Sequence, residues 1–79
     1  VVTSTHRLEF FNAHIVAAMQ ELRFRAGYQC SIVRRMCVTT ALAHLRHAFG
    51  LANALQDGAR KALCMRLMNW LRTDLRRAS

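Results

Sequence analysis

Apolar residues recur along this chain at spacings of three and four, which is the pattern of amphipathic helices rather than of strands. The first such segment predicts a helix over about 5–26, with Thr3, Ser4 or Thr5 as its N-cap. Gly27 follows two arginines and fits a glycine cap at the end of this helix. The stripe expected to face the core is Leu8, Phe11, Ile15, Met19 and Leu22.

Gly50 interrupts the second periodic segment, but the phase of the apolar positions predicts that the helix continues through it. At 100° per residue, Leu51, Ala52 and Leu55 fall on the face occupied by the apolar residues before the glycine. We therefore predict a helix over about 29–56, the longest of three, which ends at the turn Asp57-Gly58. Asp57 would cap the helix that follows. The stripe before the glycine is Val33, Cys37, Ala41, Leu45 and Ala48.

The last segment predicts a third helix over about 59–78, the most amphipathic of the three. Proline is absent from the chain, and only three glycines occur. Three helices joined by short links pack as a small antiparallel bundle, so we expect an all-α fold with residues 1–79 forming a single helical domain. The apolar arc of the third helix is Leu63, Cys64, Leu67, Met68, Trp70, Leu71 and Leu75.

Several classes of protein are excluded by the order of the residues. Charge-free segments such as 10–20 and 47–56 are far shorter than the ~20 apolar residues of a spanning helix. Residues 1–5 lack the basic and then apolar pattern of a signal peptide. Three cysteines cannot all pair within one chain, so we expect reduced thiols. These features favour an intracellular protein of a reducing compartment, the cytoplasm or an organelle matrix, that is not secreted.

The charge is strongly basic, with twelve Lys and Arg against four Asp and Glu and a net charge of +8. In the predicted topology the end of helix 1, the start of helix 2 and the end of helix 3 meet at one end of the bundle. A positive potential concentrated there would attract a nucleic-acid backbone or an acidic surface. The candidate anion-binding residues are Arg23, Arg25, Arg34, Arg35, Arg72, Arg76 and Arg77.

A simpler explanation covers most of these arginines, because cations near a helix C-terminus offset the helix dipole. Arg34 and Arg35 differ, since they lie in the first turns of helix 2, where the dipole disfavours cations. Both hypotheses stay open at this point: a site for phosphate or acidic groups, and a solvated basic surface without a specific ligand.

The sequence contains no catalytic motif and no metal-binding motif. Cys30, Cys37 and His44 share a helix face, but they are seven residues apart, or about 10.5 Å along the axis. That separation is too large for two of them to hold one zinc ion. His44 and His47, one turn apart, could share a ligand, but no further ligand is evident. We expect no enzymatic activity, no metal, no cofactor, and cysteines that are buried and inert.

The leading functional hypothesis is a non-enzymatic basic helical interaction protein, a small accessory subunit of a ribonucleoprotein or organellar assembly. Its partners would be other protein subunits and an RNA or DNA backbone, and a homo-oligomer is a further alternative. The competing hypotheses are a free-standing nucleic-acid-binding regulator and an adaptor or inhibitor of an acidic protein. Met19 and Met68 are interpreted as core residues. The candidate partner contacts, on arcs that should face outward, are Phe10, Ile32, Met36 and Met65.

Overall fold

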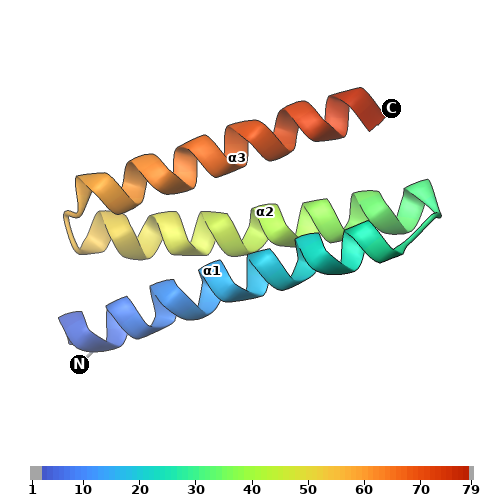
Figure 1. The fold of residues 1–79 in the computed structure, drawn as a ribbon. Helices are drawn as coiled ribbons and strands as arrows, with labels where there is room; N and C mark the ends of the chain where they lie inside the picture. The colour runs from blue at the N-terminus through green and yellow to red at the C-terminus, as the bar shows by residue number, and fades with distance from the viewer. Residues whose placement is uncertain (1–2, 79) are drawn as a thin grey trace.

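The computed structural model describes the backbone of residues 3–78 and the side chains of residues 3–76. Over that range it contains three helices and no strand: α1 (Ser4–Gly27), α2 (Ser31–Ala54) and α3 (Gly58–Ala78). Successive helices run antiparallel, and α2 lies between α1 and α3 (Figure 1). Every helix boundary falls within two residues of its predicted position, and the all-α three-helix bundle is confirmed.

The prediction that the second helix is the longest is wrong, because α1 and α2 each contain 24 residues. The predicted range was too long at both ends of α2. At its start, Cys30 is extended, with φ −70° and ψ 121°, and serves as the N-cap residue. At its other end the chain leaves the helix after Ala54. Gly50 lies inside α2, as the phase of the apolar positions predicted.

The turn from α2 to α3 closes through hydrogen bonds back to the end of α2. The backbone N–H of Gln56 donates to the carbonyl of Asn53, and that of Asp57 donates to the carbonyl of Ala52. This is the Schellman pattern, which requires a left-handed residue after the helix cap. Gln56 takes that role with φ 55°, whereas the sequence suggested that the turn is made at Asp57-Gly58. Asp57 does cap α3, as predicted, because its Oδ1 accepts from the backbone N–H of Arg60 at 3.1 Å.

The two ends of α1 are closed differently from one another. Thr3 is the N-cap, and its hydroxyl oxygen accepts from the backbone N–H of His6 at 3.2 Å. The predicted glycine cap at Gly27 is wrong, because Gly27 is part of the helix and its φ is not positive. The extended residue Tyr28 ends α1 instead, and its N–H donates to the carbonyl of Arg25.

The core follows most of the predicted stripes, and α2 contributes the largest share because it packs against both neighbours. Three residues of the predicted apolar stripes are exposed instead: Met19 is 53% exposed, Trp70 is 54% exposed and Leu63 is 37% exposed. Met68 is buried, as predicted. The buried apolar side chains that form one cluster are Phe11, Ala18, Val38, Ala41, Leu42, Leu45, Ala48, Ala52, Cys64, Met68 and Leu71.

Replacement of Gly50 by alanine should stabilise the protein. Gly50 is exposed on α2 without a positive φ, and nothing lies within 4 Å of the position that a Cβ atom would take. Alanine removes the entropic cost of a helical glycine, so G50A should raise the free energy of unfolding by about 0.5–1 kcal/mol. Urea unfolding followed by circular dichroism measures this change.

The matched control for G50A is G58A, at the first residue of α3, where helix propensity contributes less than in a helix interior. Loss of stability in G50A would contradict the prediction.

Candidate anion-binding site

The antiparallel arrangement brings the C-terminal ends of α1 and α3 and the N-terminal end of α2 to the same end of the bundle (Figure 1). The predicted arginines lie in the last two turns of α1 and α3 and in the first two turns of α2. The side chain of Arg77 lies outside the described residues. We call the remaining set the arginine end; it comprises Arg23, Arg25, Arg34, Arg35, Arg72 and Arg76.

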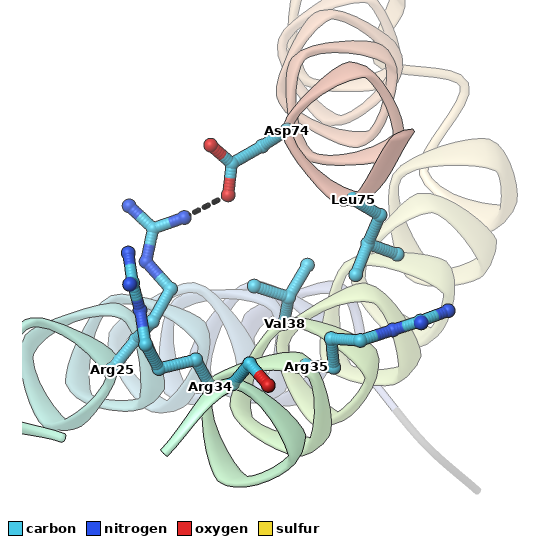
Figure 2. A pocket seen from close by; sticks show the side chains of 7 residues that line it. Arg25, Arg34, Arg35, Val38, Asp74 and Leu75 are labelled. Atoms are coloured by element: carbon cyan, nitrogen blue, oxygen red, sulfur yellow. Dashed lines mark hydrogen bonds and ion pairs between the residues drawn. The ribbon is translucent and has the colours of Figure 1, made fainter. Parts of the chain in front are cut away.

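Three of these arginines line one open cavity of about 290 Å³ between the helix ends. In the view of Figure 2, Arg25 and Arg34 lie to the left of Val38, whereas Arg35 extends to the right. Arg23, Arg72 and Arg76 do not line the cavity. The complete lining is Arg25, Ser31, Arg34, Arg35, Val38, Asp74 and Leu75.

Arg25 is already engaged by groups of α3. Its guanidinium forms an ion pair and hydrogen bond with the carboxylate of Asp74, and it lies 5.9 Å from the centroid of the Trp70 ring. The side chain of Arg25 is only 20% exposed, so the pair is partly shielded from water. Arg25 therefore links α1 to α3 and is only in part available to an outside anion.

Arg34 and Arg35 are exposed, and no ion pair joins either of them to a carboxylate within the described part of the chain. The first turn of α2 contains no acidic residue, and no side-chain hydrogen bond caps this helix. The positive end of the helix dipole thus adds to two guanidinium groups that form no ion pair among the described residues. An anion placed here would offset both guanidinium charges and the positive end of the helix dipole together.

The four predicted partner contacts are all exposed, but they do not form one surface. Ile32 and Met36 are 69% and 62% exposed, and they lie one turn apart on α2. Together with Arg35, Thr39 and Thr40 they line a shallow surface hollow of about 490 Å³. Arg35 therefore borders both the cavity and the hollow.

The other two predicted contacts lie elsewhere on the bundle. Phe10 is 53% exposed and lies in the second turn of α1, at the end opposite the arginines, while Met65 is 52% exposed and lies along α3. Sequence reasoning missed Phe24 and Tyr28, which are exposed near the turn between α1 and α2. Both residues are close in sequence to Arg23 and Arg25 at the end of a predicted helix, and this position could have indicated that they are exposed.

The described side chains contain no group of three or more histidines, cysteines or carboxylates that could hold a metal ion. His44 and His47 do lie close together, and they meet His14 of α1, which the sequence did not single out. Cys37 and Cys64 are buried, as expected, but Cys30 is exposed at the start of α2, which corrects the prediction for that thiol. Cys30 is in phase with the apolar stripe, but it is the extended residue before the first turn of α2 and does not follow the phase of that helix.

Cys30 should be the reactive thiol of this protein. The backbone N–H groups of Val33 and Ile32 lower the pKa of the Cys30 thiol, whereas burial raises the pKa values of Cys37 and Cys64. Because the thiolate is the nucleophile, iodoacetamide at neutral pH should modify Cys30 at least about tenfold faster than the other two. Peptide mass spectrometry over a time course measures the three rates.

A C30S variant is the control for this labelling experiment. It should show only the slow modification of Cys37 and Cys64 in the folded protein and fast modification of both in denaturant. Equal rates for all three cysteines in the native wild type would contradict the assignment.

No protein-family model, curated protein or solved structure matches this chain. No helix within residues 3–78 combines the length and the apolar content needed to cross a bilayer.

Proposed function

We propose that this protein is a non-enzymatic interaction protein, an accessory subunit of a larger assembly, and that its arginine end binds phosphate groups or an acidic protein surface. The observation that carries the proposal is the pair Arg34 and Arg35, which are exposed in the first turns of α2 and form no ion pair with any carboxylate that the structure describes. The helix dipole disfavours cations at these positions, so their placement calls for a compensating negative charge.

The distribution of carboxylates supports the same reading. Of the four acidic residues, Asp57 interacts with Arg60 at the opposite end of the bundle, and Asp74 pairs with Arg25. Among the described residues, the arginine end holds six arginines against Glu21 and Asp74. It therefore has a surplus of positive charge, which favours long-range attraction of anionic partners. Guanidinium groups also bind phosphate and carboxylate through two parallel hydrogen bonds, which favours arginine over lysine for this purpose.

Exposed apolar side chains beside the arginines favour a protein component in the assembly. Ile32 and Met36 line a hollow that adjoins the cavity, and Arg35 borders both. A partner that covers Ile32 and Met36 would add apolar burial to the charge pairing. This feature supports a subunit of a larger assembly more than a free-standing nucleic-acid-binding regulator, which needs only the charge.

The charge-removing variant R34Q/R35Q should weaken binding of the protein to polyanions. Fluorescence anisotropy with a labelled duplex DNA, a labelled single-stranded RNA and a labelled polyglutamate peptide compares the three kinds of anion. We expect about tenfold weaker binding to the preferred probe at moderate salt. For duplex DNA, the plot of log K against log salt concentration has a negative slope. Loss of two phosphate contacts should make that slope less negative by about 2.

The matched control is R46Q/R66Q, which removes the same charge from exposed positions outside the arginine end. It should weaken binding by less than about threefold, through net charge alone. Equal losses in both double variants would contradict a local site and indicate a solvated basic surface. Absence of binding to all three probes at low salt would reject the proposal outright, and preference for polyglutamate over both nucleic acids would favour the adaptor hypothesis.

Removal of the one carboxylate that lines the cavity should have the opposite effect. In D74N the guanidinium of Arg25 loses its ionic partner, and the repulsion between Asp74 and an incoming anion disappears. Anion affinity should rise by about threefold in the same anisotropy assay, while the thermal midpoint falls slightly because a partly exposed ion pair is lost.

A D57N variant, at the opposite end of the bundle, makes the same change in net charge and serves as the control. Weaker binding in D74N than in D57N would contradict the prediction and indicate that Asp74 holds Arg25 in its binding position.

A further inference from the structure

Three histidines from two helices meet on the contact between α1 and α2. His14 lies near the middle of α1, and His44 and His47 lie one turn apart on α2. The Nδ1 atoms of His14 and His44 are 3.1 Å apart. The His14 and His47 rings are stacked, with centroids 5.1 Å apart and an angle of 17° between their planes. All but one of the protein's four histidines therefore belong to a single cluster.

The short contact between His14 and His44 sets a limit on their protonation. One Nδ1 must donate and the other must accept, so at least one of the two rings has to be neutral. A single added proton is tolerated, because the ring that receives it can donate to its neighbour. A second proton places two N–H donors against each other at 3.1 Å and two cations in adjacent rings.

Few other charged side chains lie near the three histidines, and the cations among them cannot stabilise a protonated ring. On α1 the nearest carboxylate along the helix face is Glu21, two turns away, where it approaches Cys37. On α2 the neighbouring cation Arg46 is exposed, and from α3 Arg60 reaches α1 only at Phe11, whose ring centroid it approaches to 5.5 Å. Burial lowers the pKa of His14, and the nearby His44 and His47 lower it further. Among the described residues, no carboxylate counters this shift.

We propose that His14, His44 and His47 form a pH-sensitive contact that joins α1 to α2 when the rings are neutral and weakens that junction when they are protonated. A folded-state pKa below that of the unfolded chain means that the unfolded chain binds more protons. The stabilising contribution is thus fully present above about pH 6.5, the ordinary histidine pKa, and is lost as the pH falls below it. This device acts within the fold and is independent of the anion-binding proposal.

The test is urea unfolding of the full chain at about pH 8 and about pH 5.5, a range in which histidines titrate and most carboxylates do not. EDTA in every sample removes any effect of metal ions. The wild type should have a lower urea midpoint at the acidic pH. The H14Q variant should lose more than roughly half of that difference, because it removes the ring that contacts both of the others.

H6Q is the matched control. His6 is an exposed histidine of the same helix that interacts only with Thr3 among the described residues, and its loss should leave the pH response unchanged. Full retention of the pH response in H14Q, or an equal loss in H6Q, would overturn the proposal.

A second measurement keeps the test valid if H14Q does not fold. In an NMR titration of the wild-type histidine ring protons, His14 should titrate below the ordinary histidine pKa of about 6.5. Titration of His14 at or above about pH 6.5 would overturn the proposal.

Discussion

The burial of small alanine side chains in the core that the three helices share is the constraint on which the rest of this structure depends. Ala18 of α1 and Ala41, Ala48 and Ala52 of α2 are buried in one cluster, and three of the four have no exposed surface. Alanine fills little space, so two helices that meet at alanines approach each other closely. α1 does pack more closely on α2 than α3 does. The approach that buries these methyl groups also brings His14 within hydrogen-bond distance of His44.

The looser third helix has a different role. α3 contributes Cys64, Met68 and Leu71 to the core, but its link to α1 runs through polar and aromatic side chains. Arg25 spans the gap to Asp74 and Trp70, and Arg60 lies over the ring of Phe11. Long arginine side chains cover apolar surface with their methylene groups while the charged head meets water or a carboxylate. The same residue type thus links helices elsewhere in the bundle, whereas Arg34 and Arg35 at the start of α2 form no ion pair within the part of the chain that the structure describes.

The helices and their order could be predicted from the sequence because the apolar periodicity is strong and short links permit few topologies. Gly50 illustrates this, since the phase of Leu51 and Leu55 decided against a break that composition alone would suggest. The exposure of Trp70 and Met19 could not be predicted, because a helical-wheel projection treats every apolar face of a helix as buried. Here α1 and α3 meet through side chains rather than by close packing, so Trp70 stays exposed beside Arg25.

Within the candidate site, the topology was enough to gather the arginines at one end, but it could not separate paired from unpaired ones. Which arginine Asp74 engages depends on side-chain reach across two helices, and the sequence contains no signal for that distance. His14 was predictable in principle, because residues equally distant from the turn between α1 and α2 lie opposite one another. Position 14 then falls opposite positions near 44, and two histidines stand there.

The two turns hold the chain through different numbers of hydrogen bonds. Between α2 and α3, the backbone N–H groups of Gln56 and Asp57 donate back to α2, and the Asp57 carboxylate accepts from the N–H of Arg60. Between α1 and α2 the chain passes through the extended residues Tyr28 and Cys30, and the N–H of Tyr28 donates back to Arg25. Among the described residues, the reversal beside the arginine end is therefore the one with fewer hydrogen bonds across it.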